Sequence, residues 1–322
     1  MINYSYTQTE KTKEVLLMKT ETFEFSGYNS KILPAMLWQP EGETKALLQI
    51  THGMTEHIGR YDDFAREMTA QGIAIAGFDL RGHGKNHGDK AVASFGEGGW
   101  EAVIGDMKCF YDLLEERFHG VPHYLHGFSL GSFLLREYLS RYPEDGSGAV
   151  ILGTGNQPGW LLSIMMAIVK GQIKKVSFDG YSPLVRQLSF GAYNQKFKPN
   201  RTEKDWLCSD NETIDGFLAD PLCRENFSAG LFYQMLNAMK RTGGKEAYHT
   251  WDKEKPVLLI CGENDPVGNM GKGAKAVMQA MKQAGVDVTF HLLPGSRHMI
   301  LGEQANGAAD AAVKIIQEWI LR

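Results

Sequence analysis

Short apolar runs rich in β-branched and aromatic residues alternate along the chain with segments of helical apolar spacing. Strands are predicted at about 20–25, 31–38, 46–51, 73–78, 123–126, 149–152, 257–261 and 286–292. Helices are predicted at 61–70, 100–118, 132–142, 271–284 and 308–321. Because alternating strands and helices build βαβ units, the pattern predicts an α/β fold with a mainly parallel sheet covered on both faces. The first two strands, separated by a short turn, are expected to pair antiparallel at one edge.

The alternation stops between residues 156 and 248, where helical spacing and scattered aromatic residues take over. It resumes at Lys255, so residues 1–155 and 249–322 are expected to form one core and 156–248 an inserted helical cap. Within this segment, the run Trp160 to Val169 is followed by Lys170, Lys174 and Lys175. It fits either a lid helix that makes transient contact with a membrane surface or a helix buried in the cap.

Composition excludes several classes of protein. The 322 residues carry 34 Lys and Arg against 38 Asp and Glu, without a concentrated basic stripe, so no nucleic-acid partner is expected. The four cysteines lie far apart without metal-site spacing, which favours reduced thiols. The polar segment Met1 to Glu14 has no secretory pattern and no apolar run has spanning length, so a cytoplasmic location is expected.

The segment Gly127-Phe128-Ser129-Leu130-Gly131 has the Gly-x-Ser-x-Gly spacing of a nucleophile elbow. That spacing alone is weakly specific. Here a short apolar strand precedes it and a helix from Leu130 follows it, which is the strand, sharp turn and helix that the elbow requires. Ser129 is therefore the predicted nucleophile, since glycine on both sides permits a strained turn that exposes its hydroxyl.

A serine hydroxyl needs a base to accept its proton and an acid to orient that base, in the chain order acid then histidine. Asp265 follows the predicted strand at 257–261 and is the expected acid, with Glu263 as the alternative. His298 follows the last predicted strand and is the expected base. The predicted triad is Ser129, Asp265 and His298.

A tetrahedral intermediate also needs hydrogen-bond donors for its negative oxygen. The N–H of Leu130 is one expected donor, because it follows the nucleophile. The N–H of Met54, in the loop after the strand at 46–51, is the expected second donor. In this loop Glu56 and Arg60 are expected to brace the turn and border the substrate, and Phe128 is expected to border it from the elbow.

At these motifs the chain resembles the monoacylglycerol lipase and lysophospholipase group of α/β-hydrolases, which are related to serine aminopeptidase-like hydrolases. The resemblance rests on residues 52–61, 79–84, 127–131, 262–267 and 294–298, with support from 205–207 and 220–223, and runs from about residue 20 to the C-terminus. It implies the α/β-hydrolase fold, the same triad and oxyanion donors, and hydrolysis of an acyl ester or lipid. The group commonly has histidine before the nucleophile, whereas this chain has Phe128, which argues against specific recognition of glycerol.

Two other functions stay open from the residues alone, a peptidase or amidase with the same triad and a ligand-binding protein without activity. The reaction requires no cofactor. The histidine pairs 52 and 57, 83 and 87, and 123 and 126 have no fixed third ligand beside them, so no metal site is expected. The sequence does not predict an oligomeric state.

Overall fold

The computed structural model describes residues 18–87, 92–223 and 226–322. The segment Met1 to Glu14, which contributed to the expected cytoplasmic location, lies outside these residues. Within the described ranges, no helix has the length and apolar character needed to cross a bilayer.

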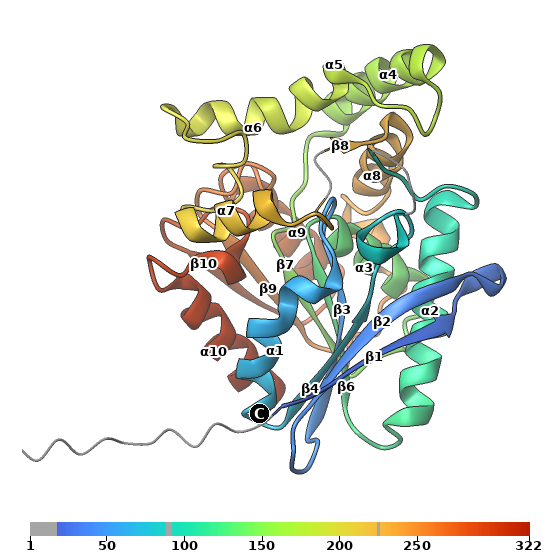
Figure 1. Cartoon of the computed structure of the whole chain (residues 1–322), viewed down its shortest axis with the longest axis vertical. Coiled ribbons are helices and arrows are strands. Elements are labelled where there is room, and N and C mark those ends of the chain that lie inside the picture. Colours follow the sequence, from blue (N-terminus) through green and yellow to red (C-terminus); the bar gives the residue numbers. More distant parts are fainter. Residues whose placement is uncertain (1–17, 88–91, 224–225) are drawn as a thin grey trace, which may run out of the picture.

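The core is one eight-stranded sheet with the order β1-β2-β4-β3-β6-β7-β9-β10 (Figure 1). Its strands are β1 (Lys19–Ser26), β2 (Ile32–Gln39), β3 (Ala46–Thr51), β4 (Ile73–Phe78), β6 (His123–Phe128), β7 (Gly148–Leu152), β9 (Val257–Gly262) and β10 (Val288–Leu293). β1 and β2 pair antiparallel at one edge and β2 pairs antiparallel with β4, whereas the pairs from β4 to β10 are parallel. The mainly parallel sheet and its antiparallel edge are as the sequence predicts.

Helices cover both faces because parallel strands are joined by right-handed crossovers. The connection from β3 to β4 runs in one direction across the sheet, so α1 (Asp62–Thr69) lies on one face, where it contacts α10 (Ala308–Ile320). The connections that move in the other direction place three helices on the opposite face, namely α2 (Gly99–Arg117), α3 (Leu130–Arg141) and α9 (Lys272–Gln283). The predicted helices all form, each within a few residues of its expected ends.

Residues 156–248, the segment expected to form the cap, follow β7 and are mainly helical. The longer helices of this segment are α4 (Gly159–Val176), α7 (Asn211–Ala219) and α8 (Ala229–Arg241), with the short helices α5 (Pro183–Arg186) and α6 (Ala192–Asn194) between α4 and α7. α4 packs against α8, which contacts α3 of the core. Figure 1 shows α4, α5 and α6 as the layer farthest from the sheet. A two-residue strand in the cap, β8 (Asn226–Phe227), pairs with β5 (Val92–Ala93) outside the main sheet.

Candidate functional site

Ser129 occupies the sharp turn between β6 and α3. Its backbone is strained, with φ of 52° and ψ of −115°. The turn requires both neighbouring glycines. A Cβ at Gly131 would lie 2.0 Å from the Thr51 carbonyl oxygen, and one at Gly127 would lie 2.5 Å from the Gly131 carbonyl oxygen. The elbow therefore packs too tightly against β3 and its own helix to accept any other residue type at these two positions.

The three predicted triad residues come together in hydrogen-bonding geometry. His298 Nε2 lies 2.8 Å from Ser129 Oγ, and His298 Nδ1 lies 2.9 Å from Asp265 Oδ2. The other carboxylate oxygen of Asp265 accepts the N–H of Val267 at 2.8 Å, which fixes the acid in its turn. Asp265 and His298 are buried. The alternative acid, Glu263, instead accepts the N–H of Gly295 at 3.3 Å.

In the loop after β3, side chains bond to both the N–H and the carbonyl oxygen of Gly53. Glu56 Oε1 accepts the Gly53 N–H at 2.6 Å and the Tyr61 hydroxyl proton at 3.1 Å. Burial raises the pKa of Glu56, opposed by nearby Arg60 and by these two donors. His52 Nε2 accepts the N–H of Leu80 at 3.0 Å, so Nδ1 carries the proton and donates to the Gly53 carbonyl at 2.8 Å. These bonds fix the backbone just before Met54.

A small cavity of about 30 Å³ adjoins Ser129. Its walls are mainly aromatic and aliphatic, with Glu56 and Lys204 among its few charged residues; they include Met54, Phe128, Phe133, Phe190, Tyr193, Trp206, Leu207, Phe217 and Met299. The rings of Phe128 and Trp206 lie 5.0 and 5.3 Å from the His298 ring. The cap supplies several of these walls, so the shape of the cavity depends on how the cap packs.

A second cavity, of about 390 Å³, lies behind Phe128 and Glu56, which border both spaces. It is more polar, since Arg60, His57, Asp62 and Asp220 contribute to its walls. Arg60, expected near the substrate, thus lines this second cavity and not the one at Ser129. Its guanidinium stacks on the cap residue Phe217 at 4.9 Å.

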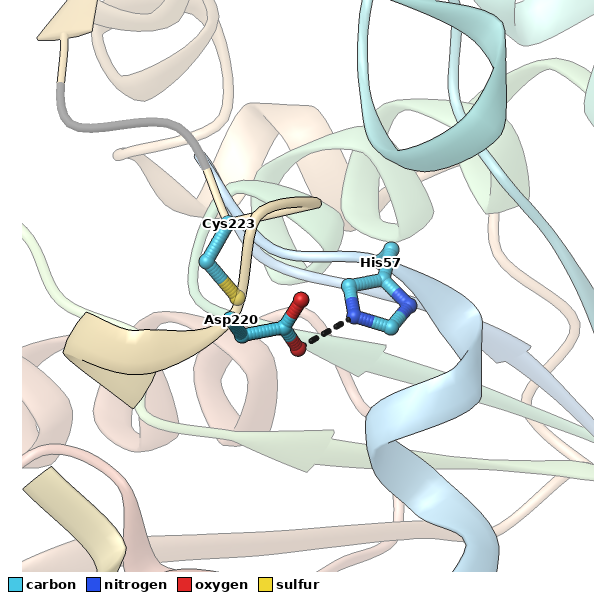
Figure 2. Close-up of side chains that lie close together, drawn as sticks. All are labelled: His57, Asp220 and Cys223. Carbon is cyan, nitrogen blue, oxygen red and sulfur yellow. Dashed lines mark hydrogen bonds and ion pairs between the residues drawn. The ribbon is translucent and has the colours of Figure 1, made fainter. Parts of the chain in front are cut away.

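His57, Asp220 and Cys223 form a cluster between the loop after β3 and the cap (Figure 2). Their potential ligand atoms lie within 4.8 Å of one another. However, His57 Nδ1 accepts the N–H of Gly59 at 3.2 Å, so the proton is on Nε2, which donates to Asp220 Oδ2 at 2.7 Å. A metal would need that nitrogen without its proton. The cluster therefore fits a hydrogen-bonded link between core and cap.

No local pattern in the sequence pairs Asp220 with His57, because the two residues are 163 positions apart. Burial acts to raise the pKa of Asp220, but hydrogen bonds from His57 and the Leu222 N–H, together with the charge of Arg60, outweigh it and lower that pKa. The aspartate is therefore charged at neutral pH.

Comparison with known proteins identifies the family of the chain. The family model described as serine aminopeptidase S33 matches residues 42–305. The chain belongs to this family. Among curated relatives, human monoglyceride lipase is 25% identical over 285 residues, covering 88% of this chain and 84% of the lipase. The monoacylglycerol lipase of Mycolicibacterium smegmatis is 21% identical over 283 residues, covering 87% of this chain and 90% of that enzyme.

Solved structures of similar shape show that the fold is that of the α/β-hydrolases. A thermostable carboxyl esterase from Bacillus coagulans superposes with a TM-score of 0.85 at 24% identity, covering 94% of this chain and 97% of the esterase. A soluble variant of monoglyceride lipase from Saccharomyces cerevisiae gives a TM-score of 0.70 at 17% identity, covering 99% and 98% of the two chains.

Proposed function

We propose that this α/β-hydrolase cleaves carboxylic esters of acyl chains through an acyl-enzyme on Ser129. The observation that carries the proposal is the continuous hydrogen-bonded arrangement of Ser129, His298 and Asp265 beside an apolar cavity. The relatives named above include lipases and an esterase, which supports an ester over an amide. The apolar walls support an acyl chain as the group bound there.

In the proposed reaction His298 Nε2 accepts the proton of Ser129 as Oγ attacks the ester carbonyl. The N–H groups of Met54 and Leu130 stabilise the resulting oxyanion. His298 then gives its proton to the departing alcohol, leaving the acyl group on Ser129. A water molecule activated by His298 attacks this ester, which releases the fatty acid and restores the serine. Asp265 holds the imidazole in orientation throughout, and no cofactor takes part.

Substrates that differ only in the bond cleaved provide the test. Purified protein is expected to hydrolyse a series of para-nitrophenyl acyl esters and to leave aminoacyl-naphthylamides intact. Ser129→Ala should abolish both ester turnover and labelling by a fluorophosphonate. Amide turnover without ester turnover would favour the peptidase function, and labelling that persists in Ser129→Ala would identify another nucleophile.

The enzyme is proposed to discriminate weakly between glycerol and other alcohols, because the apolar ring of Phe128 lies with Glu56 and Met299 between the Ser129 cavity and the polar one. A glyceryl ester and an ethyl ester of the same fatty acid should therefore have kcat/KM values within about tenfold, since one polar contact is worth about 1 kcal/mol. Phe128→His should raise the ratio in favour of the glyceryl ester. A strong glyceryl preference in the unaltered protein would contradict this assignment.

The cap is proposed to make transient contact with a lipid surface through α4. Trp160, Ile164 and Ile168 recur every four residues and have exposed fractions of 67%, 51% and 38%. They lie on one stripe of the helix, which also carries exposed lysines near its end. A cytoplasmic location stays a prediction from the sequence.

Binding to anionic phospholipid vesicles, measured by flotation, tests this contact. Trp160→Ala combined with Ile164→Ala should lower the bound fraction while turnover of a soluble ester is kept. Ile32→Ala, which truncates a residue of β2 with an exposed fraction of 52%, is the matched control and should bind as the unaltered protein does. Equal binding by all three proteins would contradict the proposal.

A further inference from the structure

Arg136 is a fully buried cation on α3, two turns after the nucleophile. Its guanidinium donates to Thr154 Oγ1 and the Gly155 carbonyl, each at 3.2 Å, to the Tyr248 hydroxyl at 3.0 Å and to the Thr242 carbonyl. Within the described residues, each of these acceptors is neutral. A charge buried without a carboxylate beside it is costly, so its field acts on the surrounding dipoles with little local compensation.

A chain of hydroxyl groups leads from this cation to the nucleophile. Thr154 Oγ1 lies 2.9 Å from Ser132 Oγ, which in turn lies 2.6 Å from the Ser129 carbonyl oxygen. Arg136 and the two residues between it and the carbonyl, Thr154 and Ser132, are fully buried. This series of hydrogen bonds therefore has no contact with solvent.

The number of protons on each group determines which group donates in every hydrogen bond between Arg136 and the Ser129 carbonyl. Arg136 can only donate and the Ser129 carbonyl can only accept. Because each hydroxyl has one proton, Thr154 must accept from Arg136 and donate to Ser132, and Ser132 must donate to Ser129. The three dipoles are then aligned head to tail, and hydrogen bonds in such a chain polarise one another.

The carbonyl at the end of the chain belongs to the peptide whose N–H is that of Leu130. Withdrawing electrons from this carbonyl makes the N–H a stronger donor, and that N–H is the proposed stabiliser of the oxyanion. The loop after β3 has the same arrangement, since His52 donates to the Gly53 carbonyl of the peptide that carries the Met54 N–H. Both proposed oxyanion peptides thus have a donor on their carbonyl oxygen.

We propose that Arg136, Thr154 and Ser132 form a buried relay that strengthens the Leu130 N–H as an oxyanion donor. The three are positioning residues, because none of them reaches the ester. The inference rests on the proposed ester hydrolysis at Ser129. It assigns part of the stabilisation of the transition state to a cation that the substrate never contacts.

Thr154→Val tests the relay, because it removes the hydroxyl while keeping nearly the same shape and leaving the other contacts of Arg136 in place. We expect kcat for a para-nitrophenyl ester to fall about five- to tenfold with KM unchanged, which is less than the loss of a whole oxyanion donor. Affinity for a trifluoromethyl ketone, which forms an oxyanion with Ser129, should fall by the same factor. Affinity for the corresponding methyl ketone should not change.

Four further variants separate the relay from general packing. Thr154→Ser keeps a hydroxyl and should restore kcat. Ser132→Ala also removes the hydroxyl that donates to the Ser129 carbonyl, so it should lower kcat at least as much as Thr154→Val does. The double variant should be no slower than Ser132→Ala alone, because both substitutions interrupt the same series of hydrogen bonds. Tyr248→Phe is the control, since it removes another hydrogen bond of Arg136 outside the relay. It should lower thermal stability and leave the trifluoromethyl ketone affinity unchanged.

The results distinguish the relay from the proposed function. If the unaltered protein hydrolyses esters but Thr154→Val and Ser132→Ala keep full affinity for the trifluoromethyl ketone, the relay is wrong and the ester hydrolase stands. Equal losses in Tyr248→Phe and Thr154→Val would also overturn the relay. If the unaltered protein hydrolyses no ester, the proposed function itself fails.

Discussion

His57 of the core and Asp220 of the cap are joined by a hydrogen bond of 2.7 Å. The same aspartate lies 3.9 Å from Arg60, whose side chain also stacks on Phe217 of the cap. His57 belongs to the loop that carries Met54, so this contact connects the position of the cap to one of the proposed oxyanion donors. Movement of the cap away from the core would have to break it.

Asp220→Leu should therefore loosen the cap. Leaving the His57 Nε2–H and Arg60 without their acceptor should cost about 1–3 kcal/mol of unfolding free energy. Hydrogen exchange of α7 should become faster in the same variant. Asp220→Asn retains an oxygen that can accept from Nε2 and is expected to lose much less. Unchanged exchange in Asp220→Leu would show that other contacts hold the cap.

Zinc should leave activity nearly unchanged, because binding it would require loss of the His57 Nε2 proton and of the hydrogen bond from Nε2 to Asp220. Ester turnover is expected to vary less than twofold after addition of micromolar Zn²⁺ or of a chelator. Cys223→Ser should behave identically in both conditions. Inhibition by Zn²⁺ that disappears in Cys223→Ser would identify the cluster as a metal site after all.

Asp265→Asn should reduce kcat by at least about a thousandfold while the protein stays folded, because the imidazole loses the acceptor that fixes its orientation. Steady-state kinetics on a soluble ester measures the effect. Glu263→Gln is the matched control, since Glu263 faces Gly295 and not His298. Its kcat should stay within about twofold of that of the unaltered protein. Loss of activity in Glu263→Gln alone would reverse the assignment of the acid.

Glu56 should support activity mainly because its side-chain oxygen accepts the Gly53 N–H, and less because it carries a charge. Glu56→Gln keeps an acceptor for the Gly53 N–H and is expected to retain most of kcat. Glu56→Leu leaves that buried N–H without a partner, so the loop shifts and kcat should fall about 10- to 100-fold. Thermal unfolding measured in parallel identifies any global loss of structure. Equal kcat values in the two variants would contradict this role.

Acid should destabilise the protein through its buried neutral histidines. Burial lowers the pKa values of His52, His83 and His126 from 6.5 to about 3. Between these pKa values the imidazoles are protonated in the unfolded chain but not in the folded chain. Their contribution to the free energy of unfolding is fully present above about pH 6.5 and is lost as the pH falls toward 3. At pH 5 the loss is about 2 kcal/mol per imidazole.

His126 isolates this effect, because the described structure gives neither of its ring nitrogens a hydrogen-bond partner. In urea unfolding at pH 7.5 and pH 5, His126→Leu should lose about 2 kcal/mol less stability on acidification than the unaltered protein does. His119→Gln alters an exposed histidine and should keep the original pH dependence. The same loss in His126→Leu and the unaltered protein would contradict the assignment.

The sheet and the grouping of Ser129, Asp265 and His298 can be predicted from local sequence patterns, because each depends on short segments and their order. Apolar runs locate the strands, and the elbow motif with a following acid and histidine locates Ser129, Asp265 and His298. The predicted ends of strands are wrong by a few residues where backbone hydrogen bonds determine those ends. β10 begins at Val288 and not at 286, because the N–H of Val286 still bonds to the Met281 carbonyl at the end of α9.

The remaining features depend on how distant segments pack, so no local pattern reveals them. Arg136 and Thr242 are 106 residues apart, and helical spacing alone would assign a charged residue on α3 to the surface. Arg60 shares a loop with Met54, and its role beside the substrate stays a prediction. The structure places it in the neighbouring polar cavity, where it stacks on Phe217 of α7.

The cap leaves the core after β7 and returns to it before β9, and these two strands are hydrogen-bonded neighbours. The entry and exit of a 93-residue segment (156–248) thus lie at adjacent positions of one sheet. Insertions, deletions or wholesale replacement there need not disturb the pairing of any strand. Descendants of such a chain can acquire a new substrate by changing this one segment while inheriting the elbow, the acid and the base unaltered.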